Sequence, residues 1–120
     1  MKTKKELIDE YKQIKFRMGV FQIRNTTNGK IFVERSENLD KVWNRHLTQL
    51  RFGGHPNPTL QKEWNEFGED KFVFEVLSEI EQREGDTTDP KKELQLLEKM
   101  FIEELQPFED KGYHNRPKTR

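Results

Sequence analysis

The stretch GVFQIRNTTNGKIFVE, residues 19–34, decides the fold. Both of its ends are rich in β-branched and aromatic residues, which is typical of strands. Between them stands Asn28-Gly29, a pair that readily adopts the positive φ angles of a tight hairpin turn. We therefore predict an antiparallel hairpin, with one strand over residues 19–25 and the return strand over residues 30–34.

Two helices are predicted after the hairpin. Apolar side chains recur at helical spacing over residues 37–52, where Ser36 can cap the first turn and Gly53-Gly54 can end the helix. A second, shorter helix with the same kind of apolar stripe ends at Gly68. A rigid loop rich in proline joins the two helices.

The rest of the chain adds a strand and a helix to this core. Residues 71–77 alternate in a way that predicts a strand buried on at least one face, and Asp89-Pro90 is a favourable start for a helix that runs to about Leu105. A short helix is also predicted over residues 2–14. The order of elements predicts an α/β (α+β) sandwich, with a central three-stranded sheet flanked by helices around one continuous core.

Size and composition exclude several classes of protein. A chain of 120 residues has the size of one small domain. The absence of cysteine excludes a disulfide scaffold, thiol catalysis and cysteine-ligated zinc. No apolar run approaches the roughly 20 residues of a membrane span, and residues 1–10 lack the apolar region of a signal peptide. We therefore expect a cytoplasmic domain without a membrane partner.

Charge is unevenly distributed along a chain whose net charge is zero. Residues 1–62 carry a net charge of +7, residues 63–110 carry −11, and residues 111–120 carry +4. A basic half predicts contact with a phosphate backbone, unless the basic and acidic faces intermix in the fold. The candidate nucleic-acid-binding residues are Arg24, Arg35, Arg45, Arg51, His55 and Lys62.

Two side chains stand out for their chemistry. Glu98 lies on the shoulder of the apolar stripe of the last helix, so that it is either a metal ligand or acid/base group, or a rim glutamate with its carboxylate in water. His46 lies on the inner edge of its helix, where it is either a catalytic residue or a hydrogen-bonded packing residue. His46, His55 and His114 lie in separate segments and show no metal-ligand spacing.

A longer series of matches follows the hairpin in one order. It comprises Ser36 to Leu39, Trp43-Asn44-Arg45-His46, Gly54-His55, Leu60-Gln61, Trp64-Asn65, Phe67-Gly68, Leu97-Glu98, Phe101-Ile102 and Gly112-Tyr113. Together with the hairpin, this series resembles a GIY-YIG nuclease domain, most closely that of phage intron-homing endonucleases. The resemblance covers about residues 18–116, which leaves residues 1–17 as an N-terminal helical extension and residues 117–120 as a basic tail.

The resemblance implies phosphodiester hydrolysis of DNA with one divalent cation, Mg²⁺ or Mn²⁺. Carried across by position, it implies that Glu98 holds the metal and that His46 supports proton transfer. Five family positions are substituted: Phe21 and Phe32 stand for the two tyrosines, Glu34 for a glycine, Val42 for the phosphate-clamping arginine, and His114 for an asparagine. The resemblance further implies that Phe21, Phe32, Val42, His46 and Glu98 lie close together in one concave site.

The substitutions remove the polar groups that the reaction would use, while they keep side chains of similar apolar volume. Phenylalanine has no hydroxyl to accept or relay a proton, and Val42 cannot donate to a phosphate. We therefore predict a nuclease-like fold with impaired cleavage that retains DNA binding. Two alternatives stay open. One is an active nuclease with a rearranged site, in which Glu34 and Glu98 bind a metal, His46 acts as base and Arg45 reaches the phosphate. The other is a protein-interaction module that uses residues 63–110.

Overall fold

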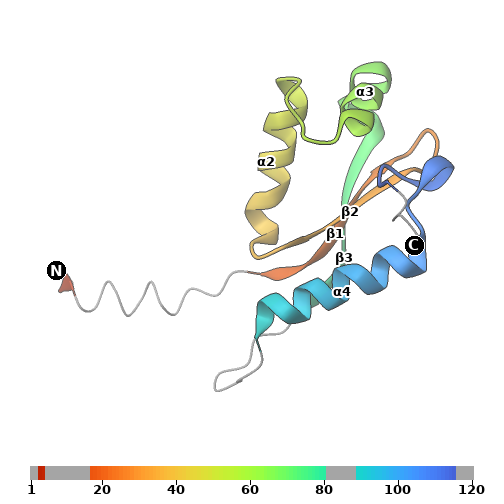
Figure 1. Cartoon of the computed structure of the whole chain (residues 1–120). Coiled ribbons are helices and arrows are strands. Elements are labelled where there is room, and N and C mark those ends of the chain that lie inside the picture. Colours follow the sequence, from red (N-terminus) through yellow and green to blue (C-terminus); the bar gives the residue numbers. More distant parts are fainter. Residues whose placement is uncertain (1–2, 5–16, 81–88, 116–120) are drawn as a thin grey trace.

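The computed structural model describes residues 3–4, 17–80 and 89–115, and it shows a three-stranded antiparallel sheet with helices on both faces (Figure 1). The elements are β1 (Met18–Asn25), β2 (Ile31–Ser36), α2 (Leu39–Arg51), α3 (Pro58–Phe67), η1 (Glu69–Lys71), β3 (Phe72–Ile80), α4 (Pro90–Leu105) and η2 (Glu109–Lys111). The predicted helix over residues 2–14 lies outside the described residues. Within the described part of the chain, no helix has the length and apolarity needed to cross a membrane.

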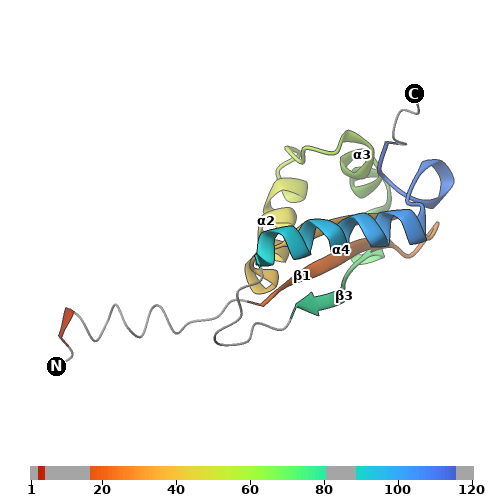
Figure 2. The ribbon, with the colours of Figure 1, turned by 60° about the horizontal axis from the view of Figure 1, so that its bottom comes forward.

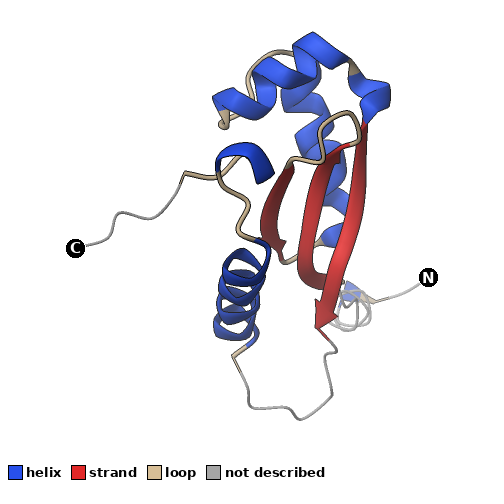
Figure 3. Cartoon of the chain, turned by 90° about the vertical axis from the view of Figure 1, so that its right-hand side faces the viewer, coloured by secondary structure: helices blue, strands red, loops and turns tan. Residues whose placement is uncertain are grey.

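The predicted hairpin is confirmed and forms two of the three strands. The strand order is β2-β1-β3, so β1 is central, and Figure 3 shows the three strands side by side. Gly29 has a φ of 78°, which an L side chain rarely adopts, and its N–H donates to the Asn25 carbonyl across the turn at 2.8 Å. Phe21 lies opposite Glu34 and Ile23 lies opposite Phe32, so these four side chains share one face of the sheet.

Apolar side chains form two clusters, one on each face of the sheet. On one face, α2 and α3 cover Phe21 and Ile23. On the other face, α4 covers Val20, Ile31 and Val33, and Figure 2 shows this helix crossing in front of the sheet. The prediction of one continuous core is therefore wrong, because the intact backbone of a sheet separates the side chains of its two faces.

The helices begin and end close to the predicted positions, with one correction. Helix α2 begins at Leu39, and its N-cap is Asn38, whose side chain accepts from the Lys41 N–H. The predicted cap, Ser36, instead accepts from the Asn38 N–H through its hydroxyl at 3.0 Å, which turns the chain before the helix. The ends of α3 at Gly68 and of α4 at Leu105 agree with prediction.

The segment after η2 runs along the free edge of β2. Ile31 and Gly112 form a parallel bridge, in which the Tyr113 N–H donates to the Ile31 carbonyl at 3.0 Å. A side chain at residue 112 would collide with the Pro107 carbonyl, so the close approach requires glycine. This segment brings His114 beside β2, where its Nε2 accepts from the Val33 N–H at 2.8 Å.

Candidate functional site

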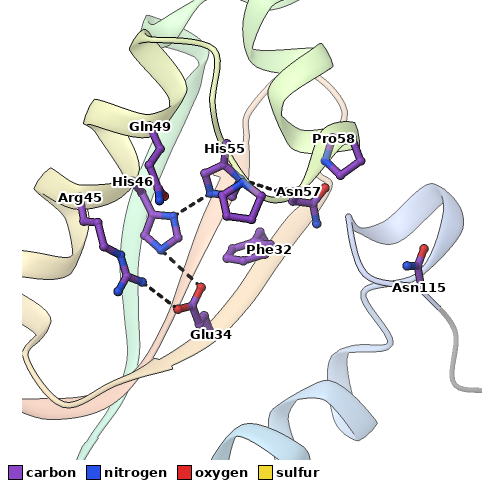
Figure 4. Close-up of a pocket in the computed structure, with 10 residues that line it drawn as sticks. Phe32, Glu34, Arg45, His46, Gln49, His55, Asn57, Pro58 and Asn115 are labelled. Carbon is purple, nitrogen blue, oxygen red and sulfur yellow. Dashed lines mark hydrogen bonds and ion pairs between the residues drawn. The ribbon is translucent and has the colours of Figure 1, made fainter.

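A cavity of about 550 Å³ opens between β2, α2 and the loop that precedes α3 (Figure 4). Strand β2 supplies Phe32 and Glu34 from the same face, because they are two residues apart. Helix α2 supplies Arg45 and His46. The full set of lining residues is Phe32, Glu34, Arg45, His46, Gln49, His55, Pro56, Asn57, Pro58 and Asn115.

Two phenylalanine rings hold His46 in place. Phe21 is fully buried, and its ring meets the His46 ring edge-on with centroids 5.5 Å apart. Phe32 makes a similar contact at 5.6 Å and stacks on His114 at 5.1 Å. Val42 is buried in the cluster beneath α2. The aromatic and aliphatic groups at these positions therefore act as packing side chains around an imidazole.

A directional chain of hydrogen bonds runs through the two histidines. The Asn57 N–H donates to His55 Nδ1 at 3.0 Å, so a neutral His55 carries its proton on Nε2. That Nε2 lies 2.8 Å from His46 Nδ1 and must donate to it. A neutral His46 then carries its own proton on Nε2, which lies 3.4 Å from a Glu34 carboxylate oxygen. The buried His46 Nε2 thus faces Glu34 at ion-pair distance, without a hydrogen bond between them.

The environment of each group fixes its charge. Burial, which disfavours the protonated ring, lowers the pKa of His55 to about 4 and also lowers the pKa of His114. Burial opposes the charge of Glu34, but its contacts with His46 and with Arg45 at 3.0 Å outweigh that effect and leave the pKa of Glu34 below its ordinary value. The cavity therefore presents a carboxylate beside a neutral His55.

Glu98 lies on the other side of the sheet, outside the cavity. Its helix, α4, covers the face opposite to Phe21, and Glu98 does not line the cavity. One of its carboxylate oxygens accepts from the Arg35 backbone N–H at 2.9 Å, and the other accepts from Arg35 Nη1 at 2.8 Å. The expectation that Glu98 and Phe21 share one concave site is therefore wrong, because the sheet separates them and Glu98 stops at the edge of β2.

Comparisons with known proteins support a relationship to homing endonucleases. The intron-associated endonuclease 1 of Enterobacteria phage T4 is 37% identical over 62 residues, which is 52% of this chain and 25% of the relative. This chain thus spans about a quarter of the length of that protein. No family model matches the chain.

Solved structures extend the match over nearly the whole domain. The catalytic domain of the homing endonuclease I-TevI superposes with a TM-score of 0.67 and 31% identity, over 80% of this chain and 95% of that domain. A mutant form of the same domain gives a TM-score of 0.68 at 29% identity, over 82% of this chain and 93% of the other. The chain belongs to the GIY-YIG nuclease family.

The residues of this GIY-YIG domain do not fit a divalent cation as they stand. Glu98 occupies the position that the resemblance assigns to the metal ligand, but both of its oxygens accept from Arg35, whose guanidinium already balances the carboxylate charge. In the part of the chain that the structure describes, no group of three or more histidine, aspartate or glutamate side chains could hold a metal ion. A cation at Glu98 would therefore compete with the Arg35 guanidinium for the same carboxylate.

The candidate nucleic-acid-binding residues are dispersed over the GIY-YIG domain. Arg45 and His55 line the cavity, and Arg35 lies at its edge strand. Arg24 pairs with Glu75 at 2.7 Å on the sheet face opposite to His46, whereas Arg51 pairs with Glu69 at the end of α2. Lys62 is exposed on α3.

Basic and acidic segments intermix across the fold. Among the described residues, arginines and a lysine of the segment over residues 1–62 pair with carboxylates of the acidic segment over residues 63–110: Arg17–Glu79, Arg24–Glu75, Lys30–Glu63, Arg35–Glu98 and Arg51–Glu69. The structure therefore supports the prediction that the basic and acidic segments intermix in the fold.

No sequence pattern predicts the contact between His46 and His55. The two residues are nine positions apart across the end of a helix, and no periodicity predicts how the loop returns. Asn57, which orients His55 and also caps α3, was likewise missed. Its position immediately before Pro58 is a capping signal that could have been read from the sequence.

Proposed function

We propose that this chain is a nucleic-acid-binding member of the GIY-YIG family in which the normal cleavage chemistry is impaired. The observation that carries the proposal is the packing of Phe21 and Phe32 against His46, at the two positions where the resemblance expects tyrosine hydroxyls. Neither ring supplies a proton acceptor, and the buried Val42 supplies no donor for a phosphate. Removing one such electrostatic donor from an active site lowers the rate by roughly 10²–10³.

DNA is the proposed ligand because the relatives are named as endonucleases, one of them associated with an intron. The arginines beside the cavity are held in ion pairs, but exposed pairs of this kind contribute only about 0–1 kcal/mol and exchange readily. Arg45 is more than half exposed in its pair with Glu34. Phosphates can therefore replace carboxylates at modest cost, and binding should weaken linearly on a log–log plot as salt is added.

A plasmid-nicking assay with Mg²⁺ or Mn²⁺ tests the impaired chemistry. Wild-type protein should cleave no faster than the Glu98→Ala variant. Restoring the family residues together, by Phe21→Tyr, Phe32→Tyr, Glu34→Gly and Val42→Arg, and freeing Glu98 by Arg35→Gln, should raise nicking above that background, since His46 and Glu98 are retained. Robust cleavage by the wild type that disappears in Glu98→Ala would overturn the proposal.

One observation favours a second candidate, a nuclease with a rearranged site. Glu34 is an ionised carboxylate beside the cavity, and the histidine chain aims a donor at it. A carboxylate in that position can accept the proton of an attacking water. In this case wild-type protein nicks plasmid, and Glu34→Gln removes the activity while it preserves shape. The same assay therefore separates the two candidates.

A further inference from the structure

The contact between Arg35 and Glu98 replaces a metal site. We propose that the Arg35 guanidinium takes the electrostatic place of the divalent cation at Glu98, so that this domain contacts a DNA phosphodiester without a metal. The inference rests on the proposed function for its ligand, but the occupancy of Glu98 by Arg35 rather than by a metal is tested without DNA.

The contact is built into the backbone as well as the side chain. Arg35 pairs with Val20 of the central strand, which fixes β2, and its outward N–H holds one oxygen of Glu98 at 2.9 Å. The Arg35 side chain donates from Nη1 to the other oxygen of Glu98 at 2.8 Å. Glu98 is only 20% exposed in this arrangement. A carboxylate engaged at both oxygens by one residue has a preformed counter-charge.

Arg35 keeps donors available for a second anion. A guanidinium has five N–H donors, and the pair with Glu98 uses one of them, on Nη1. Among the described residues, Nε and Nη2 of Arg35 make no hydrogen bond, and the side chain is 44% exposed. The free side of a guanidinium fork matches two phosphate oxygens, which an ammonium group does not.

The neighbourhood of Arg35 is a groove with further cations. A cavity of about 350 Å³ lies where β2 ends and α2 begins, and Arg35, Lys41 and Arg45 all line it. Two carboxylates line it as well, Glu34, which pairs with Arg45, and Glu37. Three cationic side chains from a strand and a helix therefore line one groove and outnumber its two carboxylates, so that the groove carries positive charge without a metal.

The Glu98→Gln variant distinguishes the two roles of Glu98, because a metal ligand and a partner of Arg35 predict opposite changes in DNA affinity. If Glu98 holds a metal that bridges to the phosphate, Glu98→Gln weakens DNA binding. If Arg35 replaces the metal, Glu98→Gln releases the guanidinium from its carboxylate and strengthens DNA binding. The gain should be about fivefold, because an ion pair whose arginine is 44% exposed is worth about 1 kcal/mol.

The first experiment titrates Mn²⁺ into the protein without DNA and detects the free ion by electron paramagnetic resonance. Wild type and Glu98→Gln should bind Mn²⁺ equally weakly. Arg35→Gln should bind it about tenfold or more tightly, because removal of a cation within about 4 Å unmasks the carboxylate for a doubly charged ion. The double variant should lose that gain. Arg17→Gln is the matched control, since Arg17 pairs with Glu79 and Asp40 and does not line the groove.

The second experiment measures binding of a labelled DNA duplex by fluorescence anisotropy, in EDTA and in Mg²⁺ at equal ionic strength. Equal affinity in both buffers and a gain in Glu98→Gln support the proposal. Tight Mn²⁺ binding by the wild type that Glu98→Gln abolishes, or DNA binding that requires Mg²⁺, overturns it. Absence of DNA binding in every variant overturns the proposed function, while the Mn²⁺ titration still decides whether Arg35 occupies the metal position.

Discussion

Acidification should destabilise this protein through His55. The ring is 8% exposed, and its Nδ1 already accepts from the Asn57 N–H, so a second proton has no favourable place. Burial lowers the pKa of His55 from an ordinary value of 6.5 to about 4. A base whose pKa is lower in the folded state than in the unfolded state binds more protons when unfolded. Its contribution to stability is therefore complete above pH 6.5 and is lost as the pH falls towards 4.

The size of the effect follows from the two pKa values. Each pH unit between them corresponds to about 1.4 kcal/mol, and pH 5 lies about 1.5 units below the unfolded value. His55 should therefore account for a loss of about 2 kcal/mol in the free energy of unfolding between pH 7 and pH 5. Carboxylates with lowered pKa values, such as Glu34, add a further loss only at lower pH.

Urea denaturation at pH 7 and pH 5 measures this loss, and a histidine-ring NMR titration gives the pKa directly. The His55→Gln variant is less stable at pH 7, but its stability should change about 2 kcal/mol less between the two pH values than that of the wild type. The Phe52→Ala variant, altered at an 86% exposed side chain, is the control and should keep the wild-type pH dependence. An unchanged pH dependence in His55→Gln, or a ring that titrates near pH 6.5, would refute the reasoning.

Two further predictions concern the core. Leu94→Ala, at a side chain 1% exposed, should lower the free energy of unfolding by about 2–5 kcal/mol in urea denaturation, whereas Leu96→Ala, at a neighbour 63% exposed, should change it by less than about 0.5 kcal/mol. Equal effects would mean that α4 does not pack as described. Tyr113→Phe removes the hydroxyl that accepts from the buried Asn25 amide at 3.2 Å, and thermal denaturation should show a loss of about 1–3 kcal/mol. An unchanged melting temperature would contradict that hydrogen bond.

Local sequence signals determined most of the secondary structure. Asn28-Gly29 placed the turn of the hairpin, and alternation over residues 71–77 placed the third strand, which the structure extends to Ile80. Asp89-Pro90 placed the start of α4 to the residue. These signals act over a few neighbouring residues, through φ angles, capping and the pleat of a strand, so they can be read without knowledge of the rest of the chain.

Family positions singled out some residues of the site but not their arrangement. Phe21, Phe32 and His46 do lie together, because strand register and helix packing bring them to one face. Glu98 was placed with them by position in the family pattern, whereas in the structure it reaches only the far edge of β2. Position along the chain identifies a residue but does not show which side of a sheet it occupies.

The sequence by itself determined the elements of this protein and its resemblance to a nuclease family, and it placed Phe21, Phe32 and Val42 at positions where the resemblance expects tyrosine and arginine. Only the tertiary structure decided which charges meet. Arg35 and Glu98 are 63 residues apart, and His46 and His55 are joined across an irregular loop. Such contacts depend on the strand order and on the path of loops that have no periodicity. Because the charge available to a ligand is what remains after those contacts form, the electrostatics of the site emerge only in the folded chain.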